Sequence, residues 1–199
     1  VWVGDGMQGP SERAQPAQLT YSFPDDGVTW GLTAVSSTGP NVLNSKLVET
    51  FGAGNLDLGR EYLRQSLASW TSVSGLSYRE VADNNSPTDT DTTRTPLRGD
   101  VRIGGLGFGT SSFLAYNAFP SNASLPLGGS DMTINTSFLD APLPQDRVLA
   151  NPALNYRTLR NTISHEHGHG LGFMHQVPCN ETKLMEPFLS SLFDLQQID

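Results

Sequence analysis

All four histidines of this 199-residue chain lie within residues 165–175, whose sequence is HEHGHGLGFMH. His165 and His169 are four positions apart, so a helix places both imidazoles on one face, one turn apart. At that separation both can bind one zinc ion at about 2.0–2.1 Å. Gly172 can adopt a positive φ and end the helix, and the returning chain then offers His175 as a third ligand. The string therefore requires a helix that stops sharply beside a three-histidine metal site.

Glu166 follows the first predicted ligand and points one helical step away from it. Three nitrogen ligands with one open position are typical of catalytic zinc, whereas structural zinc fills all four positions. A carboxylate beside the open position can act as general base on a water at the zinc. Two other interpretations stay open from the residues alone. The histidines are ordinary packed residues, or the zinc is kept for structure without catalysis.

Two more residues near the string carry metal-binding atoms, and we expect neither to bind the ion. His167 lies on another face of the helix, which predicts a core-packed or partly exposed imidazole. Cys179 is the one cysteine of the chain and cannot form an intrachain disulfide. Its thiolate would occupy the position of the water, so we expect a packed thiol.

The composition excludes several kinds of partner. Twenty Asp and Glu against 12 Lys and Arg give a net charge of −8, and the chain has no basic cluster. Such a chain is not expected to bind nucleic acid or an anionic membrane surface. No apolar run approaches the roughly 18 residues that a membrane span requires.

The pattern of apolar residues predicts several strands, two helices and long loops. Alternation predicts strands at 19–23, 76–81, 100–103, 113–118 and 132–134. Helical spacing predicts one helix from Leu56 to Trp70 and a second that opens at Asn151-Pro152 and continues to about 171. We expect loops over about thirty residues after the first strand, at 83–98 and in the glycine-rich segment 104–109.

Beyond the zinc string, the chain resembles the metzincin clan of zinc peptidases and, within it, the matrixins, including bacterial members. Four segments carry this resemblance, and with gaps it can be followed over residues 19–190. They are Glu61–Val81, Gly99–Gly104, Leu114–Pro120 and the segment Lys183–Pro187, which resembles the Met-turn.

The resemblance implies an α+β, zincin-like catalytic domain with a twisted mixed sheet and a long active-site helix at about 152–171. The zinc cleft would lie between a large upper subdomain at 19–172, preceded by a leading arm at 1–18, and a small lower subdomain at 173–199. Together, 1–199 would form one catalytic domain. Matrixins continue with a last helix, so the resemblance implies that the chain is truncated after Asp199.

The resemblance also implies residue roles. Met185 would lie beneath the zinc ligands. Substrate would bind along the edge strand at Leu114, Ala115 and Tyr116 and against Pro187 and Phe188. Structural calcium would bind in acidic loops, where the candidates are Asp131 and Asp140; the alternative is that these are ordinary solvated acids.

We therefore expect a secreted, extracellular, monomeric zinc endopeptidase that cuts extended protein or peptide substrates with Glu166 as general base. It would use one catalytic Zn²⁺ and, by resemblance, Ca²⁺. Two alternatives remain: a non-catalytic, zinc-stabilised peptide-binding domain, and a zinc amidohydrolase that acts on a non-protein substrate.

Overall fold

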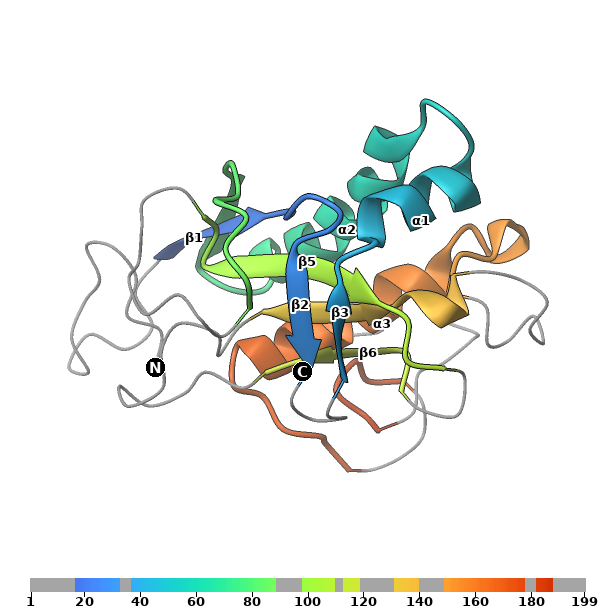
Figure 1. The fold of residues 1–199 in the computed structure, drawn as a ribbon. Coiled ribbons are helices and arrows are strands. Elements are labelled where there is room, and N and C mark those ends of the chain that lie inside the picture. The colour runs from blue at the N-terminus through green and yellow to red at the C-terminus, as the bar shows by residue number, and fades with distance from the viewer. Residues whose placement is uncertain are drawn as a thin grey trace.

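The computed structural model describes residues 17–32, 37–88, 98–109, 113–118, 131–139, 149–177 and 182–187. They form an α+β fold in which helices cover a mixed sheet (Figure 1). The helices are α1 (Leu43–Phe51), α2 (Leu56–Thr71) and α3 (Arg157–Gly170), with 3-10 turns at Thr136–Phe138 and Pro152–Leu154. None of the helices in this described part is long and apolar enough to cross a membrane.

The main sheet has five strands in the order β4-β1-β5-β7-β6. Its members are β1 (Ala17–Ser22), β4 (Leu76–Glu80), β5 (Val101–Leu106), β6 (Ala115–Asn117) and β7 (Met132–Asn135). All neighbours are parallel except β6, which runs antiparallel to β7 at one edge. The helices and the mixed sheet agree with the expected α+β fold class.

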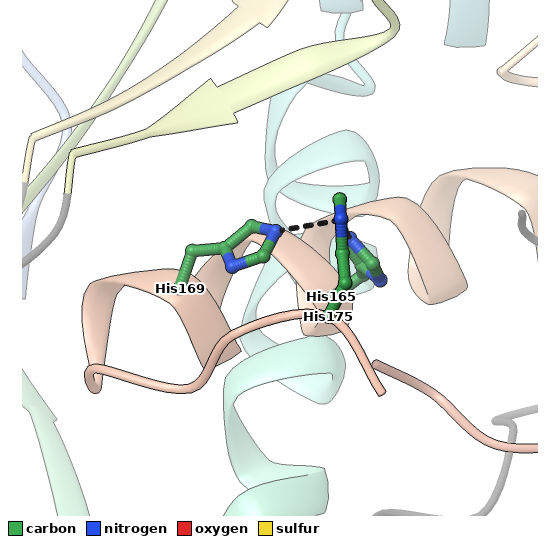
Figure 2. A group of neighbouring side chains, drawn as sticks. All are labelled: His165, His169 and His175. Carbon is green, nitrogen blue, oxygen red and sulfur yellow. Dashed lines mark hydrogen bonds between the residues drawn. The ribbon is translucent and has the colours of Figure 1, made fainter. Parts of the chain in front are cut away.

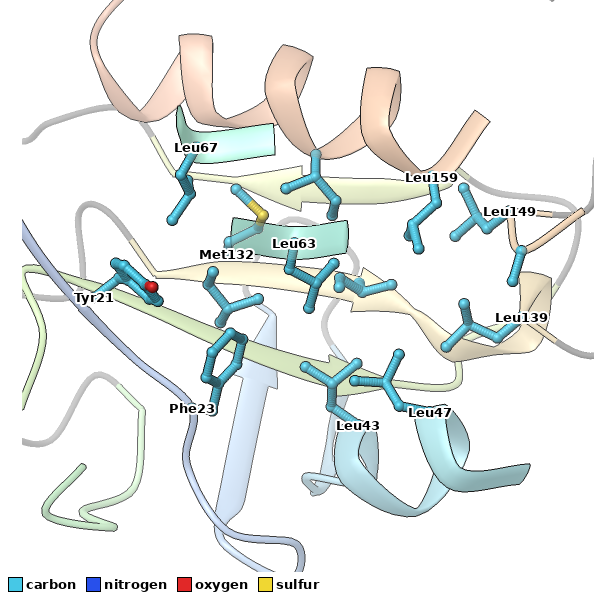
Figure 3. Packing of buried hydrophobic residues seen from close by; sticks show 14 of the residues in the cluster. Tyr21, Phe23, Leu43, Leu47, Leu63, Leu67, Met132, Leu139, Leu149 and Leu159 are labelled. Carbon is cyan, nitrogen blue, oxygen red and sulfur yellow. The ribbon is translucent and has the colours of Figure 1, made fainter. Parts of the chain in front are cut away.

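The core lies between the sheet and the helices (Figure 3). Leu63 of α2 and Leu159 of α3 are both fully buried and belong to one cluster with Ile103 of β5. Every residue of β5 is buried, as expected for a central strand covered on both faces. Helix α3 is thereby fixed against the sheet, and this contact sets the position of the histidine string.

The prediction of a loop over the thirty residues after the first strand is wrong. This stretch contains the hairpin β2 (Thr29–Leu32) and β3 (Ser37–Pro40), followed by α1. In α1, Leu43 and Leu47 are spaced as i and i+4, and both are fully buried. The helical pattern of α1 consists of only these two leucines among Ser, Thr and Asn residues, so it is too weak to predict a helix.

The glycine-rich segment 104–109 is a loop only in part, because residues 104–106 lie within β5 and only residues 107–109 lie outside a strand. A Cβ at Gly104 would overlap the ring of Trp30, which is fully buried against this face of the sheet. The Trp30 indole N–H donates to Thr133 Oγ1 at 2.8 Å. Gly104 thus permits close packing of the β2–β3 hairpin on one face of the sheet, whereas Gly105 on the other face lies against Leu43 of α1 and Thr136.

The second predicted helix begins later than expected, at Arg157 instead of 152. Asn151 does act as a cap, but of the 3-10 turn, where its side chain accepts from the Ala153 N–H at 2.9 Å. Asn155 and Tyr156 then adopt left-handed conformations with φ of 49° and 55° and interrupt the helical path. The Tyr156 ring packs against that of Tyr62, with 4.5 Å between the ring centroids.

The other helix and strand boundaries lie closer to the predicted ones. Strand β1 begins at Ala17, inside the expected leading arm at 1–18, whose residues 1–16 lie outside the described residues. Strand β6 covers only Ala115–Asn117 of the expected 113–118. Of the expected loop at 83–98, residues 89–97 lie outside the described part.

A buried ion pair joins the sheet to the segment after β4. The Arg102 side chain is 0% exposed, and its Nη2 and Nε donate to the two Asp83 oxygens at 2.7 and 2.9 Å. Burial acts to raise the pKa of Asp83, but the hydrogen bonds from Arg102 and Ser22 outweigh it and lower the pKa below its ordinary value. The folded protein therefore holds Asp83 as a carboxylate.

Replacing Asp83 by Asn is expected to destabilise the fold, because a buried guanidinium loses its charged partner. Breaking a buried pair costs about 3–5 kcal/mol, and we expect the lower end because Asp131 Oδ2 remains 3.9 Å from Arg102. The carboxylate contributes stability above its unfolded pKa of about 4, and this contribution is lost as pH falls through the lower folded value. Urea unfolding at neutral and acid pH measures both effects. A variant with wild-type stability at neutral pH would contradict this account.

Candidate metal centre

Three imidazoles converge where α3 ends (Figure 2). His165 and His169 come from the last two turns of α3, and His175 comes from the segment that follows. The His175 Nε2 lies 3.2 Å from both His165 Nε2 and His169 Nε2. One ligand nitrogen of each histidine lies within 4.8 Å of those of the other two. Among the described residues this is the one group of three or more His, Cys, Asp or Glu side chains that could hold an ion.

The turn after α3 brings the third histidine back, as the sequence predicts. Gly172 has a φ of 100°, a conformation that favours glycine. The N–H of Phe173 donates to the Gly168 carbonyl at 2.9 Å and closes the helix end. Further along, the Gln176 N–H donates to the Met185 carbonyl at 2.8 Å and fixes the chain beside His175.

Backbone carbonyls orient two of the three rings. The Nδ1 of His165 lies 2.6 Å from the Leu184 carbonyl oxygen, and the Nδ1 of His169 lies 2.8 Å from that of Phe173. A carbonyl only accepts, so each Nδ1 carries the proton and each Nε2 presents a lone pair. The Nε2 atoms are those that approach His175.

Two of the rings, those of His165 and His169, are held in the neutral form that binds metal. Burial lowers the pKa of His165 to about 4, although its bond to the Leu184 carbonyl acts in the opposite direction. Burial also lowers the pKa of His169. Neutral imidazoles suit a soft or borderline cation, and a three-nitrogen donor set suits zinc. The residues present therefore fit the metal that the sequence predicts.

Glu166 lies beside this group on the face of α3 that contacts β6. Its Oε2 accepts a hydrogen bond from the Asn117 backbone N–H at 3.1 Å. Burial raises the pKa of Glu166 to about 8, while the Asn117 bond acts to lower it. A nearby cation would favour the carboxylate.

His167 is a core residue, in agreement with the packed interpretation of the sequence. It is fully buried, and its Nε2 lies 2.7 Å from the Tyr78 hydroxyl. Its ring also packs edge-on against Trp70. Burial lowers its pKa to about 3, so His167 joins α3 to β4 as a neutral side chain.

Met185 is fully buried in a small cluster with Trp70 and Leu184. It lies against Gly168 of α3, where an added Cβ would overlap the Met185 sulfur and come within 2.9 Å of the Trp70 ring. Gly168 thus permits close contact between the helix that carries two histidines and the turn that holds Leu184 and Met185.

A Gly168→Ala variant is expected to lose about 1–2 kcal/mol of stability. The overlap with Met185 and Trp70 costs about 1–3 kcal/mol, and the better helix propensity of alanine returns at most about 1 kcal/mol. Urea unfolding measures the change. In a matched double variant, Met185→Ala should relieve part of the loss, and strictly additive effects would show that the two residues do not interact.

The remaining candidate residues fall into two groups. Leu114, Ala115 and Tyr116 lie at or in edge strand β6, and Pro187 is exposed after the turn that contains Met185. Three residues with expected roles lie outside the described part of the chain: Cys179, Phe188 and Asp140.

The structure places the calcium candidate Asp131 beside a cation of the protein itself. Asp131 is buried, and its Oδ2 lies 3.9 Å from Arg102 Nη1. Asp131 thus shares the guanidinium with Asp83, and calcium binding at Asp131 stays a prediction.

The groups that position the predicted site could not be predicted from the sequence. They are the Asn117 N–H and the carbonyls of Leu184 and Phe173. All are backbone groups, so no side-chain pattern could identify them.

No protein-family model matches the chain. The sequence is similar to serralysin from Proteus mirabilis, with 27% identity over 180 residues that cover 89% of this chain and 31% of that protein. It is also similar to hatching enzyme from Paracentrotus lividus, with 28% identity over 180 residues, 88% of this chain and 27% of that protein. The chain thus spans less than a third of the length of these curated relatives.

Among solved structures, the GM1-bound form of the ECX AB5 holotoxin aligns with 79% of this chain and 52% of that chain. The identity is 19% and the TM-score is 0.33, a likeness too low to bear on the fold. The two sequence similarities support a metzincin-type relationship, and they distinguish no family within that clan.

Proposed function

We propose that this chain is the catalytic domain of a zinc-dependent endopeptidase of the metzincin type, with matrixin-like features. The observation that carries the proposal is the convergence of His165, His169 and His175 beside the Glu166 carboxylate. The names of the relatives, serralysin and hatching enzyme, fit a protease. The division into an upper part at 19–172 and a lower part at 173–199, and action outside the cell, belong to the same proposal.

His165, His169 and His175 would hold the ion through their Nε2 atoms. Bound zinc supplies a Lewis acid that polarises the scissile carbonyl and makes the attacking water more acidic. Glu166 accepts a proton from that water and delivers it to the leaving amine. Met185 supports the site from beneath through its contact with Gly168.

Strand β6 offers a main-chain surface for an extended substrate. The Asn135 N–H donates to the Leu114 carbonyl, so residue 114 belongs to a hydrogen-bonded pair of the β6–β7 ladder. In an antiparallel ladder the next residue, Ala115, then directs its N–H and C=O away from β7. A peptide can pair with these groups by strand addition, beside Leu114 and Tyr116. Pro187 and Phe188 would line the pocket beyond the scissile bond.

The proposal is tested by mapping the cleavage products of a peptide library and of a protein mixture with the zinc-loaded chain. We expect internal peptide bonds to be cut, which yields new N-termini within the sequences. Binding of peptides without products would identify a zinc-stabilised binding domain instead. Hydrolysis confined to small non-peptide amides would identify an amidohydrolase.

A further inference from the structure

Asn117 ends strand β6 at the point where this edge of the sheet meets α3. In the β6–β7 ladder it pairs with Met132, two positions on from the outward-facing Ala115. Its N–H therefore also points away from β7. The bond from this N–H to Glu166 Oε2, at 3.1 Å, agrees with that direction.

Because of this bond, the two oxygens of the Glu166 carboxylate have different surroundings. Oε2 is held by the sheet edge, whereas Oε1 has no hydrogen-bond donor among the described residues. A general base needs one oxygen free for the proton and a fixed orientation of the group. The Asn117 N–H supplies that orientation from an element other than the helix that carries the base.

The Asn117 side chain fixes the strand against the same helix. It is 1% exposed, and a Cβ on Gly170 would overlap its amide nitrogen. Gly170 lies one turn after Glu166, so the carboxamide covers the helix face that carries the base. Neither polar atom of the carboxamide has a hydrogen-bond partner within the described structure, so its contact with α3 is one of packing.

We propose that Asn117 is the positioning residue for Glu166: its backbone N–H fixes one carboxylate oxygen, and its side chain sets the spacing between β6 and α3. The inference rests on the proposed function, since it assigns Glu166 as general base. It adds a residue from the substrate-binding edge that orients the base without touching the reacting atoms.

The first test compares Asn117→Pro with Asn117→Ala. Both variants lose the carboxamide, but only proline lacks the N–H. Proline is tolerated on an edge strand where the N–H does not join the ladder, and Tyr116 before it is already extended. We expect kcat of the proline variant to be about 10- to 100-fold below that of the alanine variant, as for loss of a hydrogen bond to a charged group. KM should differ by less than about threefold, because substrate binding does not depend on this bond. Equal kcat values in two folded, zinc-loaded variants would overturn the inference.

The second test needs no turnover and remains valid if the proline variant fails to fold. Amide hydrogen exchange of Asn117 is followed by NMR in zinc-loaded wild type, Glu166→Gln and Glu166→Ala. The Gln side chain still offers an oxygen acceptor, so protection should persist there and fall in Glu166→Ala. The amide of Tyr116, which belongs to the β6–β7 ladder, is the internal control and should not change. Asn117 protection that is the same in all three proteins would overturn the inference.

The third test uses the contact with Gly170. Gly170→Ala should displace the Asn117 carboxamide and lower kcat, and the added Asn117→Ala change should restore part of the loss at unchanged zinc content. Absence of this rescue would overturn the spacing role of the side chain. If wild type cuts no peptide while Asn117 protection still depends on Glu166, the proposed function fails and the positioning contact stands.

Discussion

A Glu166→Gln variant is expected to lose about 10²- to 10⁴-fold in kcat for peptide cleavage, the range for removal of a general acid–base group. Glutamine has nearly the same shape and keeps an oxygen acceptor for the Asn117 N–H, but it cannot take up the proton of the attacking water. Because Glu166 is not one of the three converging ligands, zinc content should stay at the wild-type level. The loss should therefore appear in turnover and not in metal binding.

The measurement pairs steady-state kinetics with metal analysis of the purified variant. Glu61→Gln is the matched control, because it removes the same charge from an exposed position on α2. A surface ion pair such as that of Glu61 with Arg64, 3.6 Å apart, is worth at most about 1 kcal/mol. Near-wild-type cleavage by Glu166→Gln would rule out Glu166 as the base.

Removal of zinc by a chelator is expected to abolish cleavage and to lower the thermal midpoint, and added zinc should restore both. The three histidines come from two segments that the ion would join. A ligand that binds only the folded state stabilises it by about 4 kcal/mol at a free concentration 1,000 times its Kd. Calorimetry with and without zinc measures this shift. A hydrolase that stays active in chelator, with no metal retained, would contradict the metal mechanism.

The metal-free protein should also be sensitive to acid. The folded pKa values of His165, about 4, and His167, about 3, lie below the ordinary 6.5. Between these values and pH 6.5 the unfolded chain binds more protons than the folded one, so stability falls as pH is lowered through this window. Bound zinc should protect His165 from this effect, whereas His167, which does not join the three converging ligands, depends on burial alone.

Local signals made part of the structure predictable. Helix α2 carries a regular apolar stripe, and the histidine string fixes its own helix, the turn at Gly172 and the return of His175. These features depend on residues within two or three turns of one another. Sequence spacing alone is sufficient for them.

The incorrect predictions concern contacts between distant segments. Gly104 is read locally as loop, but it pairs with Thr133 in the sheet, and Trp30, far away in sequence, leaves no room there for a side chain. Helix α3 starts late, after the left-handed Asn155 and Tyr156, and the Tyr156 ring contacts Tyr62 of α2. The bond from Asn117 to Glu166 requires contact between β6 and α3, and no local sequence pattern predicts that contact.

The unequal anchoring of the three histidines implies an order of metal release. His165 is buried and His169 half-buried, and both stand on a helix that is packed against the sheet. His175 is exposed and lies on a returning segment that is tied back by the bond from Gln176 to the Met185 carbonyl. If the chain binds zinc as proposed, dissociation would begin at His175, and recapture by His165 and His169 would compete with escape. The returning segment would then set the lifetime of the bound ion.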